Sequence, residues 1–332
     1  MSQKMLVTGG AGFIGNCFVR HILNKYPDYK VINLDCLTYA GNIENLNDVK
    51  NNPNYQFVHG NICDRKLVRD LVSQVDTVVN FAAESHVDRS ITGPEIFIET
   101  NVQGTLNLLQ ASKELGVDRY LQVSTDEVYG TLGKTGYFYE TTPIQPNSPY
   151  SASKASADLL VRAYFETYKM PVLTTRCSNN YGPYQYPEKL IPFFISQLLH
   201  GEKVPVYGDG LNVRDWLYVY DHCSAIDTVL HKGTVGEVYN IGGHNEKTNM
   251  EITNIILEAM GKDESSIRYV EDRLGHDKRY AIDNEKIQTQ LGWEPSLTFE
   301  EGIKQTIEWY LGNQVWMKAI ETKKAGRLEG KL

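Results

Sequence analysis

The sequence has few cysteines, no long apolar run and no excess of positive charge, and each absence excludes a class of protein. Its five cysteines are scattered and form no Cys-x-x-Cys pair, so we expect neither a disulfide framework nor a metal site. No apolar stretch approaches the roughly 18 residues that a membrane-spanning helix needs. The formal net charge of −8 argues against general binding to nucleic acid or to an anionic membrane.

The remaining composition is that of a globular protein. Hydrophobic residues make up 41% and charged residues 22% of the 332 positions, which is enough for a sizeable core. The chain is long for one compact domain, so we expect one large α/β unit with a smaller annex. Residues 5–7 already resemble a strand, which begins too early for a signal peptide, and we therefore expect a cytoplasmic protein.

Short apolar runs alternate with helical patterns through the first half of the chain. The expected strands are residues 5–8, 31–35, 55–59, 77–81, 119–124 and 172–176. The expected helices between them are residues 13–26, 65–74, 94–115 and 150–168. This alternation predicts an α/β fold with a Rossmann-type, doubly wound parallel sheet closed by right-handed crossovers.

The alternation of strand and helix patterns stops after residue 176, where tyrosine, proline and asparagine become frequent. This change predicts a smaller mixed α/β domain for binding a substrate. We expect the first domain to take residues 1–178, with a returning segment near 212–246. The second domain then takes residues 179–211 and 247–332.

A glycine-rich turn follows the first expected strand directly. In GGAGFIG, Gly10, Gly12 and Gly15 match G-x-G-x-x-G, which permits a tight turn and close approach to a pyrophosphate at a helix N-terminus. Asp35 stands 20 residues after Gly15, where a ribose-binding carboxylate is expected. A carboxylate accepts a bond from a ribose 2′-hydroxyl and repels a 2′-phosphate, so the sequence predicts NAD rather than NADP. The alternative is that Asp35 only caps a loop.

Two motifs carry reactive side chains. STDEVYG places Thr125, Asp126 and Glu127 at the carboxyl edge of the sheet, where open α/β folds bind ligands. PYSASK places Tyr150 and Lys154 four residues apart, on one face of a helix. Two adjacent carboxyl groups repel as anions, so one tends to keep its proton and the pair supplies an acid beside a base. This requires both to lie in a bend after the strand.

The start of the Tyr150 helix is signalled locally. Ser148 is a candidate N-cap, and Pro149 suits the first helical position. An unperturbed tyrosine has a pKa of about 10, which is too high for a base at neutral pH. We expect the neighbouring ammonium of Lys154 to favour the phenolate of Tyr150.

The motifs TGGAGFIG, STDEVYG and YSASK together resemble an extended short-chain dehydrogenase/reductase. FAAESHVDRS, RCSNNYGPYQYPEKLIP, PVYGDGLNVRDWLYVYDH and DRLGHDKRYAID make a narrower resemblance, to the dTDP-glucose 4,6-dehydratases, from about Met1 to the region of Trp316. The resemblance implies NAD as cofactor and dTDP-glucose as small-molecule substrate. It also implies a homodimer built on a bundle of the helices around Asn101 and Tyr150.

The same resemblance implies a reaction in three steps. Tyr150, assisted by Lys154, takes the proton of the glucose 4-hydroxyl while the C4 hydride passes to NAD. The resulting ketone acidifies the C5 proton, so that Glu127 removes it as general base while Asp126, protonated, donates to the departing 6-hydroxyl. The hydride then returns to C6 and leaves a 4-keto-6-deoxy sugar.

Binding residues are likewise implied by the resemblance. Those expected at the cofactor are Gly9, Gly12, Phe13, Ile14, Gly15, Asp35, Cys36, Leu37, Thr38, Asn61, Ile62, Phe81, Ala82, Ala83, Ser85, Thr100, Tyr150, Lys154 and Asn180. Those expected at the nucleotide sugar are Ser85, Thr125, Asn179, Lys189, Leu190, Pro205, Val206, Tyr207, Arg214, Asn249, Arg273 and His276. Arg214 and Arg273 are expected to clamp the pyrophosphate. Two positions depart from the pattern, since Asn61 replaces an acidic residue and Leu274 a proline.

Two alternatives stay open. A related NAD-dependent nucleotide-sugar epimerase or decarboxylase shares Tyr150 and Lys154 but needs no acid and base at Asp126 and Glu127. A regulator that binds NAD without catalysis is the other alternative, although every reactive residue is present. The thymine base is implied by the resemblance alone. The downstream pathway stays open between a surface polysaccharide, such as one with a rhamnose branch, and a glycosylated natural product.

Overall fold

The computed structural model describes residues 3–272 and 276–328, and a parallel sheet of seven strands forms its centre. The order is β10-β6-β5-β4-β1-β2-β3, and each neighbouring pair is parallel. The strands are β1 (Lys4–Thr8), β2 (Lys30–Asp35), β3 (Tyr55–His59), β4 (Thr77–Asn80), β5 (Arg119–Thr125), β6 (Val172–Cys177) and β10 (Val238–Ile241). The strand order reverses between β1 and β4, as in a doubly wound sheet, so the predicted fold class is confirmed.

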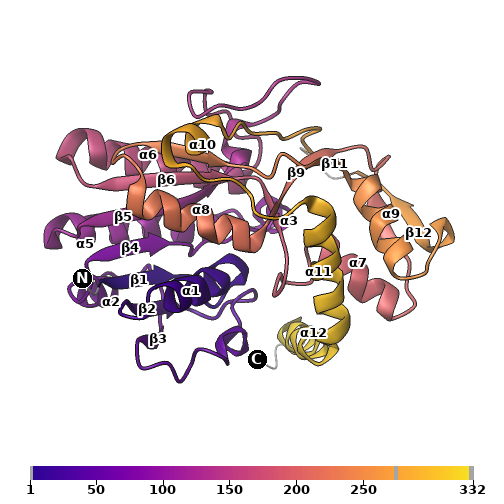
Figure 1. Ribbon diagram of the computed structural model, residues 1–332, viewed down its shortest axis with the longest axis horizontal. Helices are drawn as coiled ribbons and strands as arrows, with labels where there is room; N and C mark the ends of the chain where they lie inside the picture. The colour runs from indigo at the N-terminus through magenta and orange to yellow at the C-terminus, as the bar shows by residue number, and fades with distance from the viewer. Residues whose placement is uncertain (1–2, 273–275, 329–332) are drawn as a thin grey trace.

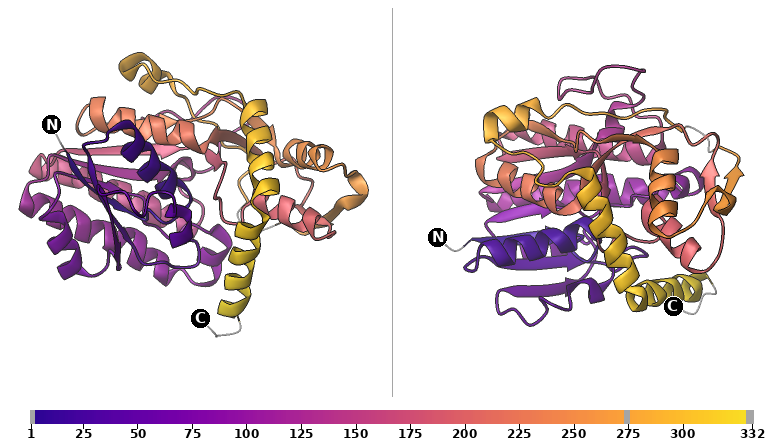
Figure 2. Two further views of the ribbon diagram at one scale, coloured as in Figure 1. Left: turned by 60° about the horizontal axis from the view of Figure 1, so that its bottom comes forward. Right: turned by 45° about the vertical axis from the view of Figure 1, so that its right-hand side comes forward.

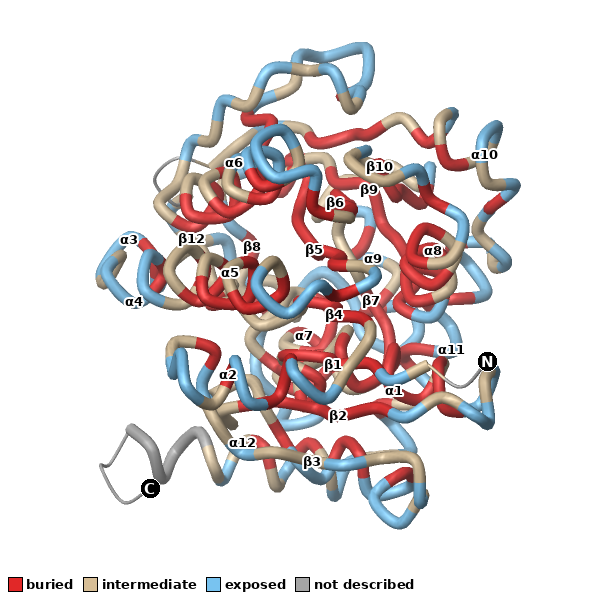
Figure 3. Tube along the Cα trace, turned by 90° about the vertical axis from the view of Figure 1, so that its left-hand side faces the viewer, coloured by how far each residue is buried: buried red, intermediate tan, exposed pale blue. Residues whose placement is uncertain are grey.

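Helices cover both faces of this sheet (Figure 1). Met5 and Val7 pack into one core and Leu6 into the other, because successive residues of a strand point to opposite faces. One face carries α1 (Phe13–Lys25), α8 (Val219–Lys232) and α10 (Glu285–Leu291), and the other carries α2 (Arg65–Val72), α5 (Thr105–Leu115) and α6 (Pro149–Tyr168). The strands are accordingly mostly buried, whereas the outer faces of the helices are exposed (Figure 3).

The connection from β4 to α5 differs from the single helix predicted over residues 94–115. It consists of α3 (Val87–Thr92), α4 (Glu95–Phe97) and a π-helical segment, η2 (Ile98–Gly104), which leads into α5. The wide π-helical turn presents Asn101, whose side chain accepts a bond from Glu84 N at 2.9 Å and donates to Glu84 O at 3.0 Å. Asn101 also donates to Ser153 Oγ on α6 at 2.8 Å, and so ties the loop after β4 to that helix.

A smaller lobe lies beyond the carboxyl ends of the sheet strands (Figures 1 and 2). Its strands are β7 (Asn179–Tyr181), β9 (Val213–Tyr218) and β11 (Glu246–Thr248) in one sheet, and β8 (Val204–Tyr207) and β12 (Ile267–Val270) in another. Its helices are α7 (Leu190–Leu199), α9 (Asn249–Ala259), α11 (Phe299–Gly312) and α12 (Gln314–Leu328). Short 3₁₀ turns are η1 (Ile43–Leu46), η3 (Asp126–Tyr129) and η4 (Glu264–Ser266).

The domain boundaries given above stay a prediction. Strand β9 pairs within the small lobe, and α10 packs against α8 on the large sheet. In residues 3–272 and 276–328, no helix combines the length and the apolar character needed to cross a membrane.

Candidate active site

A cleft of about 340 Å³ opens at the carboxyl edge of the large sheet. All five candidate catalytic residues line it, namely Thr125, Asp126, Glu127, Tyr150 and Lys154. The predicted cofactor residues that line it are Gly9, Gly12, Phe13, Ile14, Gly15, Asp35, Cys36, Thr38, Asn61, Ile62, Phe81, Ala82, Ala83, Ser85, Thr100, Tyr150, Lys154 and Asn180. Leu37 is not among the lining residues. The cleft therefore joins the glycine-rich turn to the reactive side chains.

The turn after β1 is shaped by glycines at three cleft positions. Gly9 has a φ of +72°, and a Cβ there would lie 2.7 Å from the backbone nitrogen of Ala82. A Cβ at Gly15 would lie 2.2 Å from Gly9 O, so α1 packs directly on the turn. Gly12 caps α1 without a side-chain bond, which leaves the helix N-terminus facing the cleft. The first glycine of the turn that lines the cleft is thus Gly9, which has the positive φ. Gly10, the first glycine of the matched motif, does not line the cleft.

Asp35 ends β2 inside this cleft. Its Oδ2 accepts a bond from Ala11 N at 2.9 Å, and its Oδ1 accepts one from Leu37 N at 2.8 Å. Asp35 therefore does cap the loop, and it also lines the cleft. Burial raises the pKa of its carboxyl group. A glycine cradle at an open helix N-terminus, with a carboxylate one strand away, fits a dinucleotide.

Tyr150 and Lys154 lie one turn apart on α6, and both are buried. The predicted N-cap is confirmed, because Ser148 Oγ accepts a bond from Ser151 N at 3.1 Å and Pro149 occupies the first turn. Lys154 Nζ donates to the carbonyl oxygen of Val123 on β5 at 2.8 Å. This bond fixes the ammonium at the base of the cleft.

The acidic pair lies in a bend, as its proposed chemistry requires. Strand β5 ends at Thr125, and Asp126 opens the 3₁₀ turn η3. Thr125 Oγ1 accepts a bond from Glu127 N at 3.3 Å, which holds the turn. Asp126 is 1% exposed, and its Oδ2 has no hydrogen-bond partner in the part of the chain that the structure describes. That oxygen is thus available to a ligand in the cleft.

The electrostatics of the cleft favour the uncharged forms of its reactive groups. Burial, followed by the charge of Glu127, raises the pKa of Asp126 well above its ordinary value. Burial also lowers the pKa of Lys154. The pKa of Tyr150 is raised well above its ordinary value, by burial first and then by the charge of Glu127. This direction is opposite to the one expected from a neighbouring ammonium.

The residues expected at the nucleotide sugar are divided between two places. Ser85, Thr125, Asn179 and Lys189 line the cleft, and Lys189 Nζ donates to Ser85 O at 3.2 Å. The others that the structure describes do not line it and belong to the small lobe: Leu190, Pro205, Val206, Tyr207, Arg214, Asn249 and His276. Arg273 and Leu274 lie outside the described residues.

Arg214 of the small lobe acts electrostatically on the acidic pair. Its charge lowers the pKa of Asp126 against the larger effect of burial. Its Nη2 donates to Asp277 O at 2.9 Å, and its guanidinium lies 4.4 Å from the ring centre of Tyr280. His276 lies edge-on to the ring of Tyr207, with centroids 6.4 Å apart.

Several lining residues were not expected from the sequence. These are Glu84, Ile96, Cys177, Ser178, Gln185, Tyr186 and Glu188, among others. Gln185, Tyr186 and Glu188 belong to the string NNYGPYQYPEKL, whose unusual composition was the available signal. Among residues 3–272 and 276–328, no three His, Cys, Asp or Glu side chains are grouped so as to hold a metal ion.

Comparison with known proteins assigns the chain to a family. A family model described as GDP-mannose 4,6 dehydratase matches residues 6–306. The chain belongs to this dehydratase family. A dTDP-glucose 4,6-dehydratase of Xanthomonas campestris is 56% identical over 95% of both chains.

Two solved structures show how far the likeness extends. DesIV of Streptomyces venezuelae, a dTDP-glucose 4,6-dehydratase solved with NAD bound, is 53% identical with a TM-score of 0.93, over 96% of this chain and 99% of its own. A UDP-glucose 4-epimerase of Thermotoga maritima is 32% identical with a TM-score of 0.87, over 94% of this chain and 99% of its own. Dehydratases and epimerases therefore share this fold, and the site must distinguish them.

Proposed function

We propose that this dehydratase is a lyase that converts dTDP-glucose to dTDP-4-keto-6-deoxyglucose with NAD as its cofactor. The observation that carries the proposal is the acidic pair. Asp126 and Glu127 lie in the bend after β5 and line the same cleft as Tyr150. An epimerase or decarboxylase needs no such acid and base. The relatives described above support both the substrate and the cofactor.

The chain's own residues fit NAD. Gly9, Gly12 and Gly15 cradle the pyrophosphate at the N-terminus of α1, and Asp35 accepts bonds from the adenosine ribose. When bound, NAD accepts a hydride from C4 of the hexose and returns it to C6 in the same turnover. The cofactor residues named above that line the cleft are proposed to surround it.

Tyr150 takes the proton of the 4-hydroxyl in the first step. Burial and the charge of Glu127 raise the pKa of Tyr150, so its phenolic proton must first pass to solvent before the phenolate can take the proton of the 4-hydroxyl. Lys154, fixed by Val123 O, holds a positive charge on the same helix face and stabilises the phenolate as it forms. A hydrogen bond with the side chain of Thr125 lowers the pKa of Tyr150 and so offsets part of this rise.

Asp126 and Glu127 remove water in the second step. The raised pKa of Asp126 favours its protonated form, which donates a proton to the departing 6-hydroxyl. Glu127 takes the C5 proton, which the adjacent ketone has made acidic. The two carboxyl groups follow one another in the bend, which lets them act on neighbouring carbons of one hexose.

The nucleotide sugar spans the cleft and the small lobe. Ser85, Asn179 and Lys189 contact the hexose side, and Arg214 supplies a charge for the pyrophosphate. The remaining small-lobe residues expected from the resemblance, with Arg273, complete the nucleotide site. Residues 1–178 with the segment near 212–246 form the NAD domain, and residues 179–211 and 247–332 form the nucleotide-sugar domain.

Three further features belong to the proposal. The enzyme is cytoplasmic and acts as a homodimer through its helix bundle. Its product, a 4-keto-6-deoxy sugar, supplies the synthesis of deoxysugars such as rhamnose. We expect thymine to be preferred over uracil in the nucleotide.

The purified protein tests the reaction directly. Incubated with dTDP-glucose, it should yield a product lighter by one water, by mass spectrometry, with no net consumption of NAD. Glu127→Gln should stop the water loss while NAD stays bound, because only the base for the C5 proton is removed. A product of unchanged mass would identify an isomerase instead, and undiminished turnover in Glu127→Gln would remove that residue from the mechanism.

A further inference from the structure

The wall of the cleft beside Asp35 is formed by residues 36–46, which we call the ribose loop. Cys36, Thr38, Ala40 and Gly41 of this loop line the cleft. The loop packs closely on the carboxylate, since a Cβ at Gly41 would lie 2.8 Å from Asp35 Oδ1. The position of the ribose loop therefore sets the shape of the site around Asp35.

Two asparagines tie the ribose loop to the glycine-rich turn. The backbone nitrogen of Asn42 donates to Ala11 O at 3.0 Å, and Asn45 Nδ2 donates to the same oxygen at 3.1 Å. Both asparagines are buried, with exposed fractions of 5% and 2%. Ala11 N in turn donates to Asp35 Oδ2 at 2.9 Å. Loop, turn and carboxylate thus form one hydrogen-bonded unit.

The C-terminal helix α12 reaches this unit from the far end of the chain. Trp316 Nε1 donates to Asn45 Oδ1 at 2.8 Å. Lys323 Nζ donates to Asn42 Oδ1 at 3.0 Å and pairs with Glu44 Oε1 at 3.2 Å. In Figure 1, α12 is the yellow helix beside the C-terminus, at the lower side of the small lobe.

The indole of Trp316 determines which way the Asn45 amide faces. An indole nitrogen can only donate, so it must meet the side-chain oxygen of Asn45. The NH₂ group of Asn45 is then directed to Ala11 O. A chain of hydrogen bonds consequently runs from Trp316 through Asn45 and Ala11 to Asp35.

The small lobe holds Trp316 in place through an aromatic cluster. The Trp316 ring lies 5.2 Å from Trp309, 5.9 Å from Tyr184 and 6.3 Å from Tyr310, between ring centroids. Trp309 and Tyr310 lie on α11, which is part of the small-lobe core. The position of the ribose loop is thus coupled to the packing of the other lobe.

We propose that α12 is a latch on the adenosine half of the cofactor site and that Trp316 is its positioning residue. The inference rests on the proposed function, because it takes Asp35 and the ribose loop to hold the ribose of NAD. A cofactor that is oxidised and reduced within one turnover need not leave. A latch that slows its release therefore suits such a reaction.

Calorimetry on the full-length protein with three ligands tests the latch. Trp316→Phe keeps an aromatic side chain and removes the indole donor, so NAD and ADP-ribose should each bind about five-fold more weakly, the effect of one lost hydrogen bond. Nicotinamide mononucleotide, which lacks the adenosine half, should bind as it does to the unmodified protein. Trp293→Phe is the matched control, because it also removes a buried indole donor, bonded to Ser224 Oγ at 2.8 Å, but lies outside the aromatic cluster, and it should leave ADP-ribose binding unchanged.

A second pair of variants avoids the packed cluster altogether. Lys323→Met should weaken ADP-ribose binding, whereas Lys318→Met on the same helix should not. Equal affinities for ADP-ribose in Trp316→Phe and Trp293→Phe, or in the two lysine variants, would overturn the latch while the proposed function stands. Failure of the unmodified protein to bind NAD would overturn both.

Discussion

At the scale of single residues, the elimination depends on a carboxyl group that keeps its proton. Asp126 is 1% exposed, and burial together with the charge of Glu127 raises its pKa. We predict that Asp126→Asn, which preserves the shape but cannot release a proton, slows water loss by about 10²- to 10⁴-fold. Mass spectrometry of the product measures the rate, and calorimetry with NAD should show unchanged affinity. Turnover at the original rate would assign the acid elsewhere.

Glu127 has a second effect, through the charge it places near Tyr150. That charge is the second largest cause, after burial, of the raised pKa of Tyr150. Glu127→Gln removes it, so the pKa of Tyr150 should fall and the oxidation at C4 should reach its half-maximal rate at a lower pH. Single-turnover oxidation of dTDP-glucose across a pH series measures this. Glu114→Gln, at an exposed position outside the cleft, should leave the profile unchanged, and a shift to higher pH would contradict the assignment.

These residues show what a sequence can and cannot specify locally. The cap at Ser148, the proline after it and the shared face of Tyr150 and Lys154 were all predicted, because they depend on neighbours within one helix turn. The direction of the Tyr150 pKa was predicted wrongly. It depends on burial and on the charge of Glu127, which lies in the turn η3 after β5, and the spacing of residues within one helix contains neither quantity.

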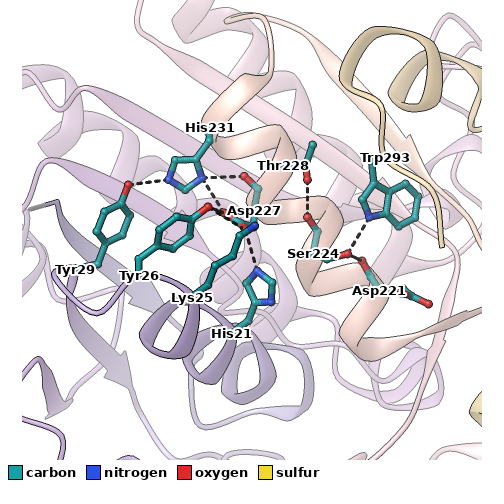
Figure 4. Close-up of polar contacts among 10 residues, drawn as sticks. All are labelled: His21, Lys25, Tyr26, Tyr29, Asp221, Ser224, Asp227, Thr228, His231 and Trp293. Carbon is teal, nitrogen blue, oxygen red and sulfur yellow. Dashed lines mark hydrogen bonds and ion pairs between the residues drawn. The ribbon is translucent and has the colours of Figure 1, made fainter. Parts of the chain in front are cut away.

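At the scale of secondary-structure elements, α1 and α8 are joined by a buried charge (Figure 4). Asp227 on α8 accepts bonds from His21 Nε2 at 2.8 Å and Lys25 Nζ at 2.6 Å on α1, and from the OH of Tyr26, the residue after α1, at 3.0 Å. His231 Nδ1 lies 2.8 Å from the same carboxylate. Although burial alone would raise it, these hydrogen bonds hold the pKa of Asp227 far below its ordinary value. The hydrogen bond to Asp227 likewise raises the pKa of His231.

The contacts of Asp227 with α1 and with His231, which we call the Asp227 clamp, make the free energy of unfolding depend on pH in a defined window. The contribution of Asp227 is present above the unfolded carboxyl pKa of about 4, and that of His231 is complete below about 6.5 and lost as pH rises through its raised value. Asp227→Asn should therefore cost about 3 kcal/mol near pH 5.5 and less near pH 9. Urea unfolding at both values measures this. Lys25→Met, which removes a half-exposed partner, should cost under about 1 kcal/mol. An equal loss of stability at both pH values for Asp227→Asn would contradict the Asp227 clamp.

The elements differ in how far the sequence predicts them. Apolar periodicity predicted the strands and main helices of the large sheet, because each helix buries one face against the sheet and most strands bury both of theirs. The π-helical segment η2 was missed, since a turn that widens around Asn101 leaves the helical pattern nearly unchanged. The contact of α12 with the ribose loop was missed as well, because Trp316 and Asn45 are 271 residues apart and share no local signal.

At the scale of the whole molecule, the topology assembles the site. Strand order reverses between β1 and β4, so segments that follow β1, β2, β4, β5 and β6 all meet at one edge. That convergence was predictable from the order of strands alone. The placement of the small-lobe residues was not, because it depends on how the small lobe packs against the large sheet, and Arg214 comes close enough to affect the pKa of Asp126 only through that packing.

The outer surface of the helix bundle supports the proposed homodimer. Helix α6 directs Tyr150 and Lys154 toward the cleft and exposes Leu159, at 54%, on another face. Exposed isoleucines lie on the contacting elements α3 and η2: Ile91 and Ile98. Exposed apolar side chains on adjoining helices are the kind of surface that a subunit interface covers.

A single charge on that surface should therefore separate the subunits. We predict that Leu159→Arg converts the dimer to a monomer in light scattering coupled to gel filtration, because an interface desolvates the guanidinium without giving it a partner. Leu211→Arg is the matched control, since Leu211 is 58% exposed but lies in the small lobe, away from the bundle. It should remain dimeric. A dimer that survives Leu159→Arg and dissociates with Leu211→Arg would place the interface on the small lobe, and α6 would then support Tyr150 without help from a second subunit.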